Sequence, residues 1–287
     1  MRGERLHHRE LVEGNGPSGA SRGASGLDQF YTRPDLARLY ARQVMTRRPD
    51  PDTLFVEPSA GMGAFVHPLK RAGRKIRAMD IEPRSHGVAQ GDFLATTNIF
   101  DGEHSAIVVI GNPPFGKNAA MAVRFFNHAA NYADEIAFIV PRTFRKISLG
   151  QRLHRNFHLE ADRDVPGDAF IRDGSAWTVP CAWQIWTRCE AMRELPPSPC
   201  VAHLIDYTSK RRAGFAMRRV GYYAGRIVTD NIHALSESTH YFMREVKAGV
   251  IDILKRIDWL GVAQQTAGVR SLSKREIAIH LAAACDG

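Results

Sequence analysis

The sequence predicts an α/β fold with a parallel sheet. Short, mostly apolar runs alternate with stretches whose apolar residues recur at helical spacing, and these runs cover residues 53–56, 75–80, 106–110 and 135–141. Gly61 and Gly63 follow the first run, where a tight turn opens a helix. The second run ends in Asp80, about twenty residues further on, where nucleotide-binding α/β folds place a carboxylate for ribose hydroxyls. Glu82 is the alternative carboxylate.

Length, composition and charge narrow the class of protein. The 287 residues, of which 44% are hydrophobic, suit a globular domain of ordinary size with a smaller appendage. The net charge of +9 and the pI near 9.6 favour a polyanionic partner over a small metabolite.

Several classes of protein are not expected from this sequence. No apolar run approaches the ~20 residues that span a bilayer, and the N-terminus has no apolar signal core. We therefore expect a cytoplasmic protein without a membrane partner. The four cysteines form no Cys-x-x-Cys pair and no histidine cluster accompanies them, so we expect reduced thiols and no metal site.

Composition divides the chain into three parts. Residues 1–26 are rich in Gly, Ser and Arg and are predicted to form a disordered basic arm. Residues 27–195 hold the strand and helix patterns and are predicted to form the main domain. Three prolines within residues 195–199 mark its end, because they do not fit inside a regular element. Residues 200–287 are predicted to be a C-terminal basic appendage.

The first helix is expected just before the first strand. Thr32, followed by Pro34 and Asp35, resembles a capped helix start. The apolar residues that follow at helical spacing are Leu36, Leu39, Tyr40 and Val44.

The later part of the chain gives weaker patterns. Residues 163–175 are predicted to be a loop, and an alternating aromatic run over 179–186 is predicted to be a final strand or hairpin. Apolar residues at helical spacing predict one amphipathic helix over 242–257. Ser273 and Glu276 form a capping box for a last helix.

The most informative segment is Asn112-Pro113-Pro114-Phe115, which follows the apolar run 106–110. Residues before proline are pushed out of the α region, so the backbone is expected to be extended and rigid here. The prolines also remove two donors, which leaves the Asn112 side-chain oxygen and the Pro113 carbonyl as acceptors for one NH2 group. Phe115 adds a flat face. Two acceptors and an aromatic plate are what a flipped-out adenine requires.

This segment resembles the catalytic motif of the amino-methyltransferases, which transfer a methyl group from S-adenosylmethionine to the N6 amine of adenine in nucleic acid. Further motifs of that family occur upstream in the family's order, at residues 29–34, 57–65 and 91–94. The resemblance covers about residues 28–186. It implies a Rossmann-like, seven-stranded class I methyltransferase sheet, mostly parallel, with helices on both faces and a small C-terminal appendage.

The same resemblance implies the site residues. The catalytic residues would be Asn112, Pro113, Pro114 and Phe115. Glu57 would face the methionine ammonium of the cofactor, Asp92 would accept from its adenine amine, and Phe93 would pack on its ring. The full set implied to bind S-adenosylmethionine is Gln29, Tyr31, Thr32, Glu57, Pro58, Ala60, Gly61, Gly63, Asp80, Asp92, Phe93 and Asn112.

Several cations are candidate contacts for nucleic acid. Lys117 follows the catalytic motif, and three more cations follow the run 135–141 at its carboxyl end, the edge where α/β sheets bind ligands. A basic segment dotted with aromatic residues lies in the tail. The predicted contacts are Lys117, Arg142, Arg145, Lys146, Lys210, Arg211 and Arg212. The cations after the run 135–141 could instead be solvated charges of a loop. The basic segment in the tail could instead be a half-buried pair of strands.

The predicted reaction is direct, in-line attack by the adenine N6 amine on the sulfonium methyl, without a metal or a covalent intermediate. DNA is the favoured substrate, and RNA stays open because no long insertion offers a target-recognition domain. Protein-glutamine methylation is an alternative, because an amide NH2 fits the same acceptors, although that family usually has Tyr where this chain has Phe115. A non-catalytic nucleic-acid-binding subunit, or dependence on a partner subunit, is the alternative from another class.

Overall fold

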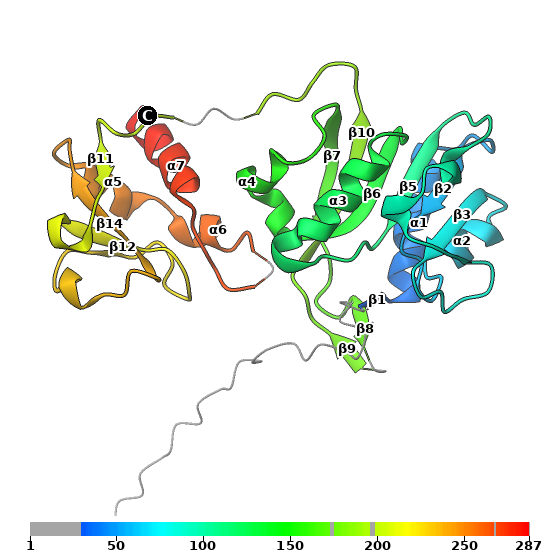
Figure 1. Cartoon of the computed structure of the whole chain (residues 1–287), viewed down its shortest axis with the longest axis horizontal. Coiled ribbons are helices and arrows are strands. Elements are labelled where there is room, and N and C mark those ends of the chain that lie inside the picture. Colours follow the sequence, from blue (N-terminus) through cyan, green and yellow to red (C-terminus); the bar gives the residue numbers. More distant parts are fainter. Residues whose placement is uncertain (1–29, 173–174, 196–198, 267, 287) are drawn as a thin grey trace, which may run out of the picture.

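A seven-stranded sheet forms the larger part of the computed structural model of this chain (Figure 1). Its strand order is β4-β3-β2-β5-β6-β10-β7. The strands from β4 to β6 run parallel, whereas β10 is antiparallel to both of its neighbours. The bounds are β2 Leu54–Glu57, β3 Lys75–Asp80, β4 Ala89–Gln90, β5 Ile107–Gly111, β6 Glu135–Pro141, β7 Phe157–Asp164 and β10 Cys181–Arg188. This mostly parallel sheet confirms the predicted fold class.

The structure describes residues 30–172, 175–195, 199–266 and 268–286. Gln29 and the arm predicted over residues 1–26 lie outside these ranges.

Helices cover both faces of the sheet because successive strand residues point to opposite sides. Helices α1 (Pro34–Arg47) and α2 (Val66–Arg71) cover one face, where Phe55, Val108 and Ile110 pack against α1. Helices α3 (Ala120–Ala129) and α4 (Ile147–Gly150) cover the other face, which includes Val109. The central strands are fully buried, which explains why β5 is a continuous apolar run.

The carboxyl ends of the parallel strands meet at one edge of the sheet. Strand β2 ends at Glu57, β3 at Asp80, β5 at Gly111 and β6 at Pro141. Open α/β sheets bind ligands at this edge.

A three-stranded sheet covers part of this edge, and it corrects two predictions. It has the order β1-β8-β9 and consists of β1 (Tyr31–Thr32), β8 (Phe170–Arg172) and β9 (Ser175–Trp177). The predicted loop over 163–175 is therefore wrong, because strand β8 pairs with β1 there. Thr32 is a strand residue and not a helix cap. Arg33 occupies the N-cap position of α1, and its side chain pairs with Asp35 and Asp168.

The C-terminal part builds its own sheet and core. The antiparallel order is β11-β14-β12-β13, and one face packs against the three C-terminal helices. The bounds are β11 Ile205–Tyr207, β12 Phe215–Arg218, β13 Ile227–Val228, β14 His240–Glu245, α5 Val250–Arg256, α6 Trp259–Ala263 and α7 Lys274–Asp286.

The helix predicted over 242–257 is wrong in its first half. Phe242 lies in β14, and α5 begins only after Gly249, whose φ of +87° breaks the pattern. The capping box of the last helix is confirmed, because the Ser273 backbone N–H donates to the Glu276 carboxylate at 2.8 Å and the Glu276 N–H donates to Ser273 Oγ at 3.2 Å.

The C-terminal part contacts the main domain through the start of α7. Lys146, just before α4, forms a buried ion pair with Glu276 at 3.1 Å and donates to the Ser271 carbonyl at 2.8 Å. Arg275 donates to the Gln151 side chain at 2.6 Å. Because Lys146 follows the carboxyl end of β6, the C-terminal part is attached beside the ligand-binding edge.

Candidate active site

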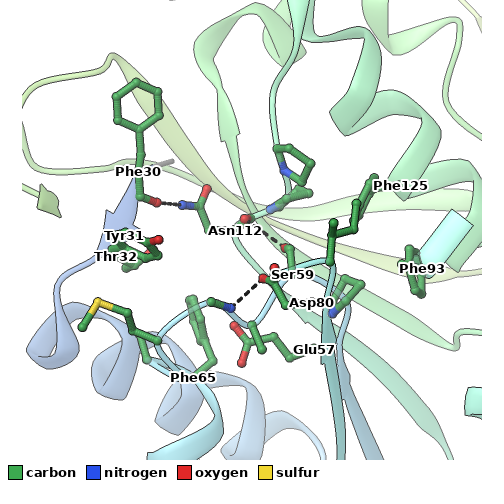
Figure 2. A pocket seen from close by; sticks show the side chains of 18 of the residues that line it. Phe30, Tyr31, Thr32, Glu57, Ser59, Phe65, Asp80, Phe93, Asn112 and Phe125 are labelled. Carbon is green, nitrogen blue, oxygen red and sulfur yellow. Dashed lines mark hydrogen bonds between the residues drawn. The ribbon is translucent and has the colours of Figure 1, made fainter. Parts of the chain in front are cut away.

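A pocket lies at the carboxyl edge of the sheet, between β1, the loop after β2, the end of β3 and the segment after β5 (Figure 2). Most of the residues predicted to bind a cofactor or to act in catalysis line it. These are Tyr31, Thr32, Glu57, Pro58, Ala60, Gly61, Asp80, Phe93, Asn112, Pro113, Pro114 and Phe115.

The Asn112 side chain is held in one orientation. Its Nδ2 donates to the Phe30 carbonyl at 2.9 Å, as the dashed line in Figure 2 shows. Because a carbonyl only accepts, the amide nitrogen must face Phe30 and the amide oxygen must face away from it. Asn112 Oδ1 is buried and has no hydrogen-bond partner among the described residues. A buried acceptor without a donor is costly, by about 1–3 kcal/mol, so this oxygen is suited to a ligand donor.

The backbone around Asn112 is fixed as well. Ser59 Oγ donates to the Asn112 carbonyl at 3.1 Å, which joins the loop after β2 to the segment after β5. The next carbonyl, that of Pro113, accepts no hydrogen bond from any residue that the structure describes. Two acceptors of adjacent residues therefore lack hydrogen-bond partners among the described residues.

Two further pocket residues hold buried polar atoms without partners. Glu57 is 2% exposed, and its Oε2 has no hydrogen-bond partner in the described part of the chain. Burial, and then the charge of Asp80, raise the pKa of Glu57 well above that of an ordinary glutamate. Thr32 Oγ1 is also buried and unpaired among described residues. The pocket thus contains a buried carboxyl group and a buried hydroxyl, each with an oxygen that has no hydrogen-bond partner among the described residues.

The glycine loop after β2 is built around Asp80. Gly61 has a φ of +45°, and its N–H donates to Asp80 Oδ2 at 2.7 Å. A Cβ at Gly61 would lie 3.0 Å from the Tyr31 ring, so a larger residue would press into the pocket. The second Asp80 oxygen accepts from the Glu82 N–H at 2.9 Å. Asp80 and Glu82 both line the pocket, so the structure leaves both as candidates for the ribose hydroxyls.

Among the described residues predicted to bind the cofactor, two do not line the pocket. Asp92 caps the short 3-10 turn η1 (Phe93–Ala95) by accepting from the Leu94 N–H at 2.9 Å, and this turn delivers Phe93 to the pocket wall. Gly63 has a φ of +78°, and a Cβ there would lie 2.8 Å from Ser85 Oγ. Gly63 therefore shapes the loop without facing the ligand space.

Sequence reasoning missed several lining residues: Phe30, Ser59, Met62, Ala64, Phe65, Ile81 and Phe125. Phe30 is the most important of them, because its carbonyl orients Asn112. Its ring stacks on Trp177 with centroids 6.4 Å apart. The pairing of β1 with β8 brings Phe30 to the pocket, and the sequence gives no signal for that pairing. Phe115 is 8% exposed and forms part of the wall.

Three cations predicted to contact nucleic acid are already paired within the chain. Arg142 pairs with Asp164 at 3.0 Å, and Arg145 pairs with both Asp162 and Asp164 at 2.6 Å. Lys146 pairs with Glu276 at the contact between the two parts of the chain. By contrast, Lys117, Arg211 and Arg212 are exposed, and Lys210 lies over the Phe242 ring.

No group of His, Cys, Asp and Glu side chains in the described residues is arranged to hold a metal ion. Within the same ranges, no helix has the length and the apolar character needed to cross a bilayer.

The chain is similar in fold to solved methyltransferase structures. No protein-family model matches it, and no curated protein sequence does. A proposed RNA methyltransferase of Pyrococcus horikoshii is 14% identical, with a TM-score of 0.44, and the alignment covers 57% of this chain and 88% of that one. The methyltransferase subunit of a type I restriction-modification system from Streptococcus thermophilus is 14% identical, with a TM-score of 0.42 and coverages of 55% and 45%. Magnesium protoporphyrin IX methyltransferase of Synechocystis, solved with bound S-adenosylmethionine, is 12% identical, with a TM-score of 0.39 and coverages of 54% and 79%. At these scores the likeness concerns the fold, so the functional proposal rests on the residues of the pocket.

Proposed function

We propose that this protein transfers a methyl group from S-adenosylmethionine to the exocyclic N6 amine of adenine in nucleic acid, with DNA favoured over RNA. The observation that carries the proposal is Asn112 Oδ1, a buried acceptor without a partner among the described residues, which lies beside the Pro113 carbonyl at the carboxyl end of β5. An exocyclic NH2 group offers two donors, which these two acceptors would satisfy.

The pocket fits the proposed cofactor. Glu57 would accept from the methionine ammonium, and Thr32 Oγ1 would donate to the methionine carboxylate, so that both unpaired atoms gain partners. Asp80, or Glu82, would accept from the ribose hydroxyls. When bound, the cofactor supplies an electrophilic methyl group. A cation beside Glu57 would also offset the burial that holds its carboxyl neutral.

The residues of the chain would act by holding and polarising the target amine. The lone pair of an adenine amine is delocalised into the ring, which makes the amine a weak nucleophile. Two acceptors draw the amine toward tetrahedral geometry and stabilise the positive charge that develops on its nitrogen. Phe115 would hold the base by its flat face. Since Phe30 holds the Asn112 side chain and Ser59 holds the Asn112 backbone carbonyl, part of the rate gain would come from orientation.

Nucleic acid is the proposed partner because the chain carries a net charge of +9. The C-terminal part, attached beside the ligand edge, is the proposed second contact surface. Its residues 200–287 contain thirteen Lys and Arg against eight Asp and Glu.

The direct test is transfer of labelled methyl groups from S-adenosylmethionine to four pools in parallel: duplex DNA, single-stranded DNA, total RNA and protein. We expect label in DNA, recovered as N6-methyladenine after digestion to nucleosides. Label only in RNA would overturn the DNA preference, and label only in protein would overturn the proposed substrate class. No label in any pool, with the cofactor bound, would favour a non-catalytic subunit or one that requires a partner.

A further inference from the structure

Two large aromatic rings stand out on the surface of the C-terminal part. Tyr222 is 72% exposed and Tyr223 is 55% exposed. Their rings contact each other edge to face, with centroids 5.0 Å apart and planes at 86°. They belong to a tight turn, residues 221–225, which we call the tyrosine turn.

The tyrosine turn is anchored firmly without using its tyrosines. Gly221 and Gly225 have φ values of +98° and +99°, which favour glycine. The Gly225 N–H donates to the Arg218 carbonyl at 2.7 Å, and the Gly221 N–H donates to the Arg270 carbonyl at 2.9 Å. Ala224 is buried, and Gly225 packs directly against Trp259. The small residues thus make the core contacts, so folding does not require the exposed rings.

Arginines surround the tyrosine turn. The Arg270 guanidinium lies over the Tyr222 ring, with Cζ 4.8 Å from the centroid, and donates to the Tyr222 carbonyl at 3.3 Å. Arg226 lies 6.0 Å from the centroid of Tyr223. Arg218 donates to the Val220 carbonyl at 3.1 Å. None of these three arginines forms an ion pair with a carboxylate in the described ranges. These guanidinium groups therefore have no carboxylate partner in the described ranges that a phosphate would have to displace.

The tyrosine turn is connected to the edge that bears the active site. Arg270, which pairs with the turn, is followed by Ser271, whose carbonyl accepts from Lys146 of the main domain. Lys146 in turn follows β6, the strand next to β5 and its Asn-Pro-Pro-Phe segment. Figure 1 agrees, because the connection between α6 and α7 lies on the side of the C-terminal part that faces the main domain.

We propose that the tyrosine turn and its arginines form a stacking platform for unpaired bases of the nucleic acid strand that enters the active site. Exposed flat rings bind bases through their faces, and unpaired guanidinium groups bind phosphates and also stack. Because the backbone of the tyrosine turn is already anchored, the turn loses little conformational entropy when a base binds to its rings. This inference rests on the proposed function only in that the strand held here is the one whose adenine enters the pocket.

The test measures binding of a labelled oligothymidine strand by fluorescence anisotropy. Oligothymidine contains no adenine, so its binding does not depend on the catalytic pocket. We expect the double variant Tyr222→Ala/Tyr223→Ala to bind it about tenfold more weakly for each ring removed. Tyr222→Phe/Tyr223→Phe keeps both rings and should bind within about twofold of the unmodified protein. Leu260→Ala is the matched surface control, because Leu260 is 46% exposed and lies in α6. This variant should bind oligothymidine as tightly as the unmodified protein.

The outcomes separate this inference from the proposed function. Unchanged oligothymidine binding by the double alanine variant would overturn the platform, even if the protein methylates adenine. An equal loss of affinity for a duplex of only G·C pairs would also overturn it, because paired bases do not expose their faces. Weakened oligothymidine binding in a protein that methylates no adenine would support the platform and overturn the proposed reaction alone.

Discussion

The Asn112 side chain is oriented by a residue 82 positions away, because its Nδ2 donates to the Phe30 carbonyl at 2.9 Å. The acceptor oxygen of the amide is consequently directed away from Phe30 and stays unpaired among the described residues. The segment after β5 supplies the acceptor, and the segment before α1 decides where it faces.

This relationship predicts the behaviour of Asn112→Asp. An ionised aspartate would place an oxygen against the Phe30 carbonyl, so we expect the carboxylate to turn away and methyl transfer at pH 8 to fall by about 10²-fold. Protonation of the introduced carboxyl group gives it one donor and one acceptor, as the amide of Asn112 has. The pH–activity profile of the variant should therefore shift to lower pH relative to the unmodified protein. A profile that overlays the unmodified one would show that the contact with Phe30 does not orient the acceptor.

Thr32→Val tests the buried hydroxyl. Valine has the shape of threonine but removes an Oγ1 that lacks a partner in the described ranges, so we expect the free protein to gain about 1 kcal/mol in stability. Binding of S-adenosylhomocysteine should weaken about tenfold, because the carboxylate loses a donor. Thermal unfolding and calorimetry measure the two effects. Thr32→Ser, which keeps the hydroxyl, is the control; a loss of affinity in that variant as large as in Thr32→Val would contradict the assigned contact.

The raised pKa of Glu57 should make the stability of the free protein depend on pH. Burial, and then the charge of Asp80, raise the folded-state pKa of Glu57 well above the ordinary value, so folding favours the protonated carboxyl. Its contribution to stability is complete below the unfolded-state pKa and is lost as pH rises through the raised folded-state pKa. Glutamine does not ionise, so Glu57→Gln should not lose stability in this way as the pH rises. At alkaline pH the free variant should therefore unfold at a higher temperature than the unmodified protein.

The same residue should couple cofactor binding to pH. Binding the ammonium requires the ionised carboxylate, so affinity for S-adenosylhomocysteine should increase as pH rises through the raised pKa, with a proton released. In Glu57→Gln the affinity should be about 10–100-fold lower and should not rise over that range. Calorimetry in buffers of different ionisation enthalpy measures the proton release. Equal affinities of the two proteins across the pH range would refute the assignment of Glu57 to the ammonium.

We expect substitution of Lys146 to lower the stability of the protein and to leave its contacts with DNA phosphates unchanged. The Lys146 side chain is 10% exposed and that of Glu276 is 6% exposed, so Lys146→Met leaves a buried carboxylate without its counter-ion and should cost about 3 kcal/mol. Adding Glu276→Gln, which keeps the capping box, should recover part of this. In the double variant, the logarithm of the DNA-binding constant should fall with the logarithm of the salt concentration at the same slope as in the unmodified protein. A slope reduced by about one would instead indicate a lost phosphate contact.

The sequence predicts the central strands well because burial on both faces leaves a clear pattern. Strands β2, β3, β5 and β6 are found within a residue or two of their expected positions. Strand β7 was missed because it lies at the edge of the sheet, where a polar run such as His158 to Asp164 is tolerated. The helix over 242–257 was mispredicted because residues four apart, such as Phe242 and Val246, share a face in a strand as well as in a helix.

The pocket itself was largely predictable, and its surroundings were not. Short motifs fix Glu57, Asp80 and Asn112, since each ends or follows a strand at the same edge. The partners that neutralise Arg142 and Arg145 come from β7, which only the sheet pairing brings near. The role of Phe30 depends in the same way on a strand pairing between residues far apart in sequence.

The proposed reaction depends on Asn112 Oδ1, which would activate the target amine. We would compare the unmodified protein with Asn112→Ala, measuring N6-methyladenine formed in DNA and, separately, affinity for S-adenosylhomocysteine. We expect methyl transfer to fall by about 10²–10³-fold in the variant while S-adenosylhomocysteine still binds. Full methyl transfer by Asn112→Ala would contradict this role of Asn112.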